Sequence, residues 1–496
     1  MPKKILSIDQ GTTSSRSVLF DKKCSLIDYA QKEITQSYPS DGWVEHDPEE
    51  IWKSVFEVTN KIINKHNLGC SEIGAIGITN QRETTILWDK RTGKSVYPAI
   101  VWQDRRTSGL CQKLKDEGLT KTIKEKTGLL IDPYFSATKL AWVLDNVEGV
   151  RKKAEKGELA FGTVDSFLVW KLTEGKKHKT DVTNASRTML FNINENSWDN
   201  ELLRLFGIPE GILPEVCDNV HDYGETSLFG GSLKIGGVVG DQQAALVGQG
   251  CFEPGEAKST YGTGCFLLLN TGYQRINSEN DLLSTIAYRI ENKTTYGLEG
   301  SIFVAGSAIQ WLRDSLRLFE SASETEKIIK SRNKDSKLLV VPAFTGLGAP
   351  HWDPEARGSI FGLTRDSGIP ELTAATLESI AFQTRDLIEA MVKDGAIFTE
   401  LKIDGGMANN SWFAQKLANT LNLSVLKPKA IETTALGAAL LAGIQAGFFS
   451  SISSLRNNLS YGKTFKPEKE KILATTNKYN NWLSAVERTK GLFNNP

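Results

Sequence analysis

Short apolar runs alternate along this chain with segments that have helical apolar spacing. Residues 73–79 are almost entirely apolar and predict a buried strand, whereas the apolar positions of residues 49–64 recur at the spacing of one helix face. A second helix is predicted from Pro370 onward, because proline at the first turn and Gly395 beyond the end are typical boundary residues. Strands and helices mixed in this way predict an α/β architecture.

The first strand pair encloses a turn with unusual chemistry, residues 9–16 (DQGTTSSR). Small residues let the backbone approach a ligand, the hydroxyls donate hydrogen bonds and Arg16 adds a cation. This pattern suits the terminal phosphates of a nucleotide, with Asp9 facing Mg²⁺. The turn contains no lysine, and neither GxxxxGK nor GxGxxG occurs in the chain, so it is not a P-loop. The alternative interpretation is an ordinary tight hairpin turn.

The second half of the chain repeats this pattern of an apolar run followed by a polar turn. Residues 235–243 carry an apolar run into an acidic turn at Asp241, and residues 257–269 read as strand, Gly-Thr-Gly turn and strand. Residues 401–410 read as a strand followed by a diglycine and a polar helix start. Two hairpin turns suited to phosphates, followed by a diglycine suited to the nucleotide base, indicate a duplicated ATPase core.

The motifs together resemble those of the FGGY carbohydrate kinases, and within them the glycerol kinases. The resemblance spans nearly the whole length, and its marks are residues 9–16, 79–84, 102–106, 240–245, 261–264, 346–350 and 432–438. It implies an α/β fold of two duplicated ribonuclease-H-like domains of the actin/hexokinase type, with a nucleotide cleft between them. The expected domains are residues 1–251 and 252–496.

The implied reaction is the ATP-dependent phosphorylation of glycerol to sn-glycerol 3-phosphate, with Asp241 as the general base. The resemblance assigns the substrate to Arg82, Glu83, Trp102, Tyr134, Asp241, Gln242 and Phe266. It assigns the nucleotide to Thr12, Thr13, Ser14, Arg16, Thr263, Gly306, Gln310, Gly406 and Asn410. Asp9 is expected to hold Mg²⁺, directly or through water.

Several residues have a structural alternative. Arg82 and Glu83 could form a solvated surface pair, because exposed charges are common. Asp241 could be the N-cap of a helix beginning at Gln242. Trp102 and Phe266 could belong to the core rather than to a substrate wall. Asn409 competes with Asn410 for the nucleotide contact.

The sequence leaves two alternatives to glycerol phosphorylation open. The chain could be a kinase for another polyol or ketose, or a conformational ATPase of the actin/Hsp70 kind. The balanced charge argues against proteins that bind nucleic acid or an anionic membrane, because the chain has 59 basic and 59 acidic residues and no excess of positive charge. The six cysteines lack CxxC spacing, which argues against structural zinc and a disulfide framework. We therefore expect a cytoplasmic protein without membrane insertion. The resemblance further implies a homodimer or homotetramer.

Overall fold

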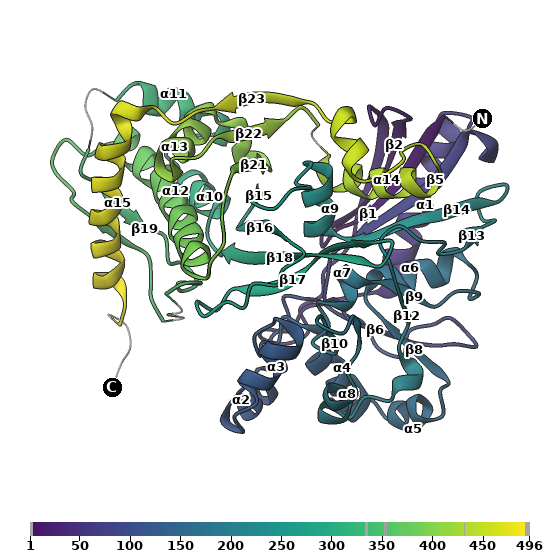
Figure 1. Cartoon of the computed structure of the whole chain (residues 1–496). Coiled ribbons are helices and arrows are strands. Elements are labelled where there is room, and N and C mark those ends of the chain that lie inside the picture. The colour runs from purple at the N-terminus through teal and green to yellow at the C-terminus, as the bar shows by residue number, and fades with distance from the viewer. Residues whose placement is uncertain (1–2, 333–335, 352, 354, 431, 492–496) are drawn as a thin grey trace.

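A computed structural model describes residues 3–332, 336–351, 353, 355–430 and 432–491 (Figure 1). Its two large sheets divide along the chain, the first lying within residues 4–240 and the second within residues 256–465. We refer to residues 1–251 and 252–496 as the first and second halves. Among the described residues, no helix combines the length and apolarity needed to cross a bilayer.

The first sheet has six strands in the order β13-β14-β5-β1-β2-β3. Their bounds are β13 (Glu225–Thr226), β14 (Leu233–Gly240), β5 (Ile73–Asn80), β1 (Lys4–Gln10), β2 (Ser14–Asp21) and β3 (Leu26–Glu33). Strands β1, β2 and β3 form an antiparallel meander, and β1, β5 and β14 run parallel. The buried strand expected over residues 73–79 is β5, at the centre of this sheet.

The second sheet has seven strands in the order β17-β18-β16-β15-β21-β22-β23. Their bounds are β17 (Leu283–Ile290), β18 (Lys293–Ile302), β16 (Cys265–Gly272), β15 (Glu256–Tyr261), β21 (Glu400–Asp404), β22 (Val425–Pro428) and β23 (Tyr461–Phe465). Like β1 and β2, β15 and β16 form an antiparallel hairpin whose first strand is parallel to a later one, β21. The repeated strand-turn-strand pattern of the sequence therefore corresponds to a repeated sheet arrangement.

The predicted long helices are present with small shifts at their ends. The helix expected over residues 49–64 is α1, capped by Asp47, and the helix expected from Pro370 is α12, which ends just before Asp394. The α-helices are α1 (Pro48–Lys65), α2 (Ser108–Asp116), α3 (Thr120–Thr127), α4 (Ser136–Asn146), α5 (Val150–Glu155), α6 (Val164–Leu172), α7 (Val182–Ala185), α8 (Asn200–Phe206), α9 (Asp241–Gly248), α10 (Gly306–Asp314), α11 (Thr325–Lys330), α12 (Ile369–Lys393), α13 (Ser411–Leu421), α14 (Thr433–Gln445) and α15 (Lys469–Thr489). The smaller strands are β4 (Glu45–His46), β6 (Ile86–Asp89), β7 (Ala99–Ile100), β8 (Leu159–Gly162), β9 (Lys179–Asp181), β10 (Phe191–Asn192), β11 (Ser197–Trp198), β12 (Glu215–Cys217), β19 (Leu339–Val341) and β20 (Ser359–Phe361).

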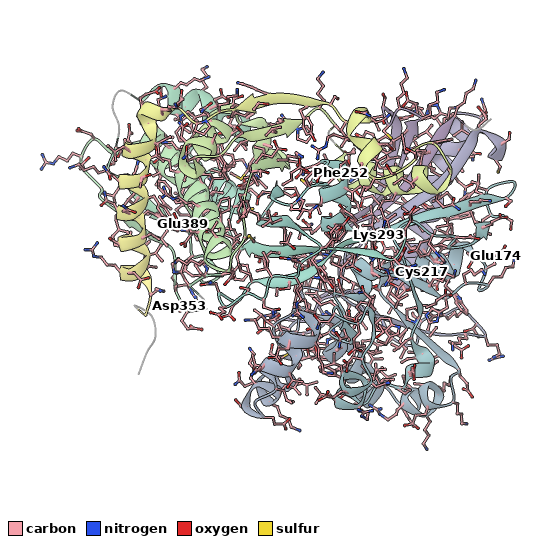
Figure 2. The ribbon with its side chains drawn as sticks, viewed as in Figure 1. Glu174, Cys217, Phe252, Lys293, Asp353 and Glu389 are labelled. Atoms are coloured by element: carbon pink, nitrogen blue, oxygen red, sulfur yellow. The ribbon has the colours of Figure 1, made fainter. Side chains whose placement is uncertain are left out.

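The two halves share a core. Helix α14 belongs to the second half by sequence but packs on α9 and on β1, β5 and β14 of the first sheet. The contact is close: a Cβ atom on Gly77 would lie 2.3 Å from the carbonyl oxygen of Ala438. Phe252, labelled near the centre of Figure 2, belongs to the same mixed apolar cluster. The small residues of α14 therefore allow this backbone-to-backbone packing.

Candidate active site

The parallel strands of the first sheet deliver the candidate residues to one edge. Asp9 on β1 lies opposite Thr79 on β5, and Asn80 on β5 lies opposite Gly240 on β14. The residues that follow β5 and β14 are Gln81, Arg82 and Glu83 in one case and Asp241 in the other. Carboxyl ends of neighbouring parallel strands are where open α/β sheets bind their ligands. The sheet order thus brings together residues that lie far apart in sequence.

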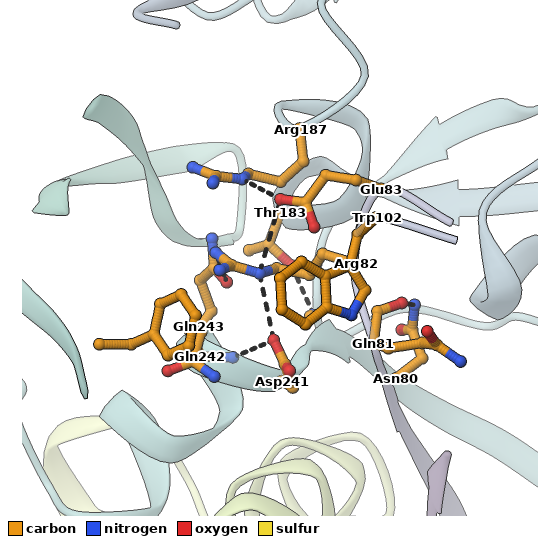
Figure 3. Close-up of polar contacts among 12 residues, drawn as sticks. Asn80, Gln81, Arg82, Glu83, Trp102, Thr183, Arg187, Asp241, Gln242 and Gln243 are labelled. Carbon is orange, nitrogen blue, oxygen red and sulfur yellow. Dashed lines mark hydrogen bonds and ion pairs between the residues drawn. The ribbon is translucent and has the colours of Figure 1, made fainter. Parts of the chain in front are cut away.

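Arg82 is buried, so the solvated-surface alternative for this residue is wrong. Only 2% of its side chain is exposed. Its Nε atom lies 3.1 Å from Asp241 Oδ1 (Figure 3). Its Nη2 atom lies 3.5 Å from the Tyr134 hydroxyl. Burial alone would lower the pKa of Arg82, but the surrounding carboxylates, Glu299 above all, hold it well above its ordinary value. The guanidinium is therefore a fixed cation at the sheet edge.

Glu83 is equally buried and has a strained backbone. Its φ of 60° lies in the left-handed region, which costs a non-glycine residue about 1–2 kcal/mol. Arg187 Nε donates to Glu83 Oε1 at 2.6 Å, while Oε2 has no hydrogen-bond partner among the described residues. Burial raises the pKa of Glu83, although Arg82 and Arg187 oppose the effect. Strain of this kind concentrates at functional sites, and the carboxylate keeps a spare acceptor for a ligand.

Two further charged residues complete this group and were missed by the sequence reasoning. Arg187 follows α7, and Glu299 lies on β18 of the second half. Glu299 Oε2 accepts from Arg82 Nη1 at 2.6 Å, and its Oε1 accepts from Arg187 Nη2 at 2.9 Å. Burial would raise the pKa of Glu299, but the two guanidinium groups lower it to about 2. The available signal was weak: a single acid between Leu298 and Gly300.

Three aromatic rings lie beside the charged group. The Trp102 ring centroid is 5.6 Å from that of Tyr134 and 6.4 Å from that of Phe266. All three side chains are partly exposed rather than sealed in the core. Trp102 Nε1 also donates to the Thr12 hydroxyl at 2.9 Å, which joins the aromatic group to the first hairpin. These rings provide an apolar surface next to Arg82.

Asp241 opens helix α9 but does not cap it. The N-cap is Gly240, so the interpretation of Asp241 as the cap of a helix starting at Gln242 is wrong by one position. The Asp241 carboxylate is 32% exposed and accepts a hydrogen bond from the backbone of Gln242 at 2.7 Å (Figure 3). The Gln242 side chain in turn accepts from Lys258, a buried residue of the second half. Burial lowers the pKa of Lys258.

The first hairpin turn connects β1 to β2. Thr12 and Thr13 lie in the turn, Ser14 begins β2, and Arg16 lies opposite Asp9. Arg16 Nη1 forms an ion pair at 2.8 Å with Glu432 of the second half. Burial raises the pKa of Asp9 to about 7; Arg16 opposes this shift, and the carboxylates of Asp241 and Glu432 add to it. Asp9 therefore lies near two other carboxylates, one from each half of the chain, and near the Arg16 cation.

The second hairpin turn connects β15 to β16 and supports the start of α10. The amide of Gly306 donates to Gly262 O at 2.9 Å, and the amide of Ala305 donates to Thr263 O at 3.0 Å. A Cβ atom on Gly306 would lie 2.4 Å from Gly262 O, so this packing requires glycine. Gln310 is exposed one turn further along α10, and Gly406 follows Gly405, which contacts Tyr261 at the base of the hairpin. Four of the nucleotide candidates, Thr263, Gly306, Gln310 and Gly406, therefore surround this turn.

Asn410 has a structural role as the N-cap of α13. Its Oδ1 accepts from the amide of Phe413 at 2.9 Å, and its Nδ2 donates to the Thr325 hydroxyl at 3.0 Å. Asn409 is exposed and accepts from Lys427 at 2.6 Å. If Asn410 contacts the nucleotide, its side chain must do so while it also caps α13.

Comparisons with known proteins agree with this arrangement. Sequence models of the FGGY family of carbohydrate kinases match residues 4–248 (N-terminal domain) and 257–446 (C-terminal domain). The chain is 55% identical over 489 residues to a glycerol kinase of Marinomonas sp. (strain MWYL1), covering 98% of this chain and 99% of that protein. It is 56% identical over 493 residues to a glycerol kinase of Alteromonas mediterranea, covering 99% of this chain and 100% of that protein.

Solved structures of carbohydrate kinases are also similar to this chain. The crystal structure of Plasmodium falciparum glycerol kinase with ADP superposes with a TM-score of 0.92 at 36% identity, covering 98% of both chains. A xylulose kinase from Lactobacillus acidophilus superposes with a TM-score of 0.90 at 23% identity, covering 99% of both chains, and is similar in fold alone.

Proposed function

This chain belongs to the FGGY family of carbohydrate kinases, and we propose that it transfers the γ-phosphoryl group of ATP to glycerol, giving sn-glycerol 3-phosphate. The observation that carries the proposal is the buried Arg82–Glu83 pair beside the aromatic group and Asp241. Such a site has no use in a conformational ATPase without a small acceptor. The glycerol kinases that resemble the chain over nearly its whole length support the same choice.

The pocket chemistry suits a triol. Glycerol presents hydroxyl groups on a short apolar backbone, so its site needs adjacent donors and acceptors and an apolar wall. Arg82 is a donor-only fork, and Glu83 Oε2 is an acceptor without a partner among the described side chains. Trp102, Tyr134 and Phe266 supply the apolar surface, while Gln242 lies next to Asp241. In this proposal all seven substrate candidates serve one small ligand.

ATP is proposed to bind between the two hairpin turns. Thr12, Thr13, Ser14 and Thr263 are proposed to donate hydroxyl hydrogen bonds to its phosphates. Arg16 would have to exchange its ion pair with Glu432 for a phosphate, which Arg binds well as a planar fork. Gly306, Gln310, Gly406 and Asn410 are proposed on the nucleoside side.

The residues present fit Mg²⁺. The Asp9 carboxylate has no hydrogen-bond partner within the described chain, and burial beside two other carboxylates raises its pKa to about 7. A divalent cation would neutralise this charge, and Mg²⁺ binds in proteins through one or two carboxylates, phosphates and water. When bound, the ion would neutralise charge on the transferred phosphoryl group. Asp9 is the residue proposed to hold it.

Asp241 is proposed as the general base. Phosphoryl transfer depends on positioning and on electrostatic stabilisation, because the transition state spreads charge over the transferred group. Asp241 is partly exposed at the sheet edge and anchored by Arg82 Nε and the Gln242 amide. Held in this way, its carboxylate can orient the primary hydroxyl of glycerol and accept its proton.

The test is ATP turnover by the purified chain with glycerol, xylulose, gluconate, ribulose or no acceptor. We expect rapid ADP formation only with glycerol, together with stoichiometric sn-glycerol 3-phosphate. A preference for one of the sugars would indicate another kinase of the family, and turnover independent of any acceptor would indicate a conformational ATPase.

A further inference from the structure

Four charged side chains form a buried cluster at the base of the proposed glycerol site: Arg82, Glu83, Arg187 and Glu299. The exposed fraction of each side chain is 2% or less. Two are cations and two are anions, so the set is neutral. A buried ion-pair set of this kind stays ionised only while all partners are present, because removal of one leaves an uncompensated charge.

Glu299 is the one member that comes from the second half. Both of its oxygens contact Arg82, Oε2 at 2.6 Å from Nη1 and Oε1 at 3.3 Å from Nη2. This forked geometry fixes the plane of the Arg82 guanidinium as well as its position. Glu299 therefore orients Arg82 from across the molecule.

The same carboxylate reaches Glu83 indirectly. Glu299 Oε1 accepts from Arg187 Nη2, and Arg187 Nε donates to Glu83 Oε1. Arg187 thereby holds one oxygen of Glu83 and leaves the other for a ligand. Its remaining Nη1 atom is buried without a hydrogen-bond partner among the described residues.

We propose that Glu299 is a positioning residue for the acceptor pocket. It fixes Arg82 directly, and it fixes Glu83 through Arg187. The part of the pocket that is built from first-half residues is complete only while β18 of the second half is docked against it. This inference rests on the proposed function and adds to it a residue that need not touch the substrate.

The closing experiment compares Glu299→Gln with a matched control, Glu378→Gln. Glu378 is also a buried acid of the second half held by two cations, Lys416 and Lys478, but it lies on α12, away from the acceptor site. For Glu299→Gln we expect KM for glycerol to rise by about 10- to 100-fold, as for loss of a charged hydrogen bond. KM for ATP should stay unchanged. The control should lower Tm and leave both KM values unchanged.

Glu299→Asp keeps the charge and should restore part of the glycerol affinity, and it also serves if Glu299→Gln does not fold. Glycerol binding followed by thermal shift gives a readout independent of turnover. An unchanged KM for glycerol in both Glu299 variants, or an equal rise in KM for ATP, would overturn the inference. If the wild-type chain does not phosphorylate glycerol, the proposed function fails instead, and this result is seen before any variant is measured.

Discussion

At the scale of single residues, the proposed chemistry depends on a few side chains held by buried partners. Asp241 shows this most clearly, because its carboxylate is partly exposed while Arg82 and the Gln242 amide fix it. Its position at the start of α9, after the Gly240 cap, separates its role from helix capping.

Asp241→Asn should therefore abolish most turnover without unfolding the protein. Asparagine retains the shape and the hydrogen bond but removes the proton acceptor, so we expect kcat to fall by about 10²- to 10⁴-fold. Asp199→Asn is the control, because Asp199 caps α8 outside the site; it should lower Tm and preserve kcat. A lowered Tm with kcat reduced less than about tenfold would contradict the general-base role.

Histidine burial predicts a pH dependence of stability. Burial lowers the pKa of His178 from 6.5 to about 4, and its Nε2 lies 2.8 Å from Phe161 O. The unfolded chain binds this proton first as pH falls, so the stability that neutral His178 contributes is present above pH 6.5 and is lost as pH falls toward 4.

The substitution His178→Gln should remove this loss of folding stability at low pH. Wild type should be the more stable form near neutral pH, and the gap in unfolding free energy should shrink by up to about 1.4 kcal/mol per pH unit during acidification. Urea unfolding of both proteins between pH 7.5 and 4 measures the gap. Parallel stability curves would show that His178 does not titrate in this way.

At the scale of elements, α9 and α14 meet backbone to backbone. A Cβ atom on Gly437 would lie 1.9 Å from Ala244 O, and one on Gly248 would lie 1.9 Å from Thr433 O. The two glycines interlock the helices from opposite sides, which couples the helix that carries Asp241 to the helix that follows Glu432.

Gly437→Ala should separate these helices despite the better helix propensity of alanine. Overpacking against backbone cannot be relieved by a rotamer change, so we expect a loss of about 3 kcal/mol in unfolding free energy. Gly109→Ala on the exposed face of α2, where a Cβ would meet no described atom within 4 Å, should be neutral or stabilising by about 1 kcal/mol. Chemical denaturation distinguishes the two; equal effects would contradict the packing argument.

At the scale of the molecule, we propose that residues 1–251 and 252–496 are two domains that move together around their ligands. We expect them not to fold independently, because α14 packs on β1, β5 and β14 of the first sheet. Polar contacts also cross between the halves, among them Arg16–Glu432, Arg82–Glu299 and Lys258–Gln242.

The fragment 1–251 should therefore expose an apolar sheet face. We expect it to bind a hydrophobic dye, to aggregate and to lack a sharp thermal transition. The reason is that the fragment loses the burial of apolar surface, which is the main driving force of folding. The full chain should unfold in one transition by both circular dichroism and tryptophan fluorescence. A monomeric fragment with a cooperative transition would show that the halves fold separately.

Local pattern determined much of this protein. Apolar periodicity located β5, α1 and α12, and turn chemistry located the two hairpins, because these features depend on neighbouring residues. The motifs around Arg82, Asp241 and Thr263 were also visible in sequence, since each lies at the end of a predicted strand.

Tertiary structure alone decided which distant groups meet. The Arg82–Glu299 pair joins residues 217 positions apart, and the packing of α14 on the first sheet crosses from one half to the other. No local pattern encodes such contacts, because they follow from the order of strands in two sheets and from how those sheets dock. The burial of Arg82 and Glu83, which excludes a solvated surface pair, is a consequence of that docking.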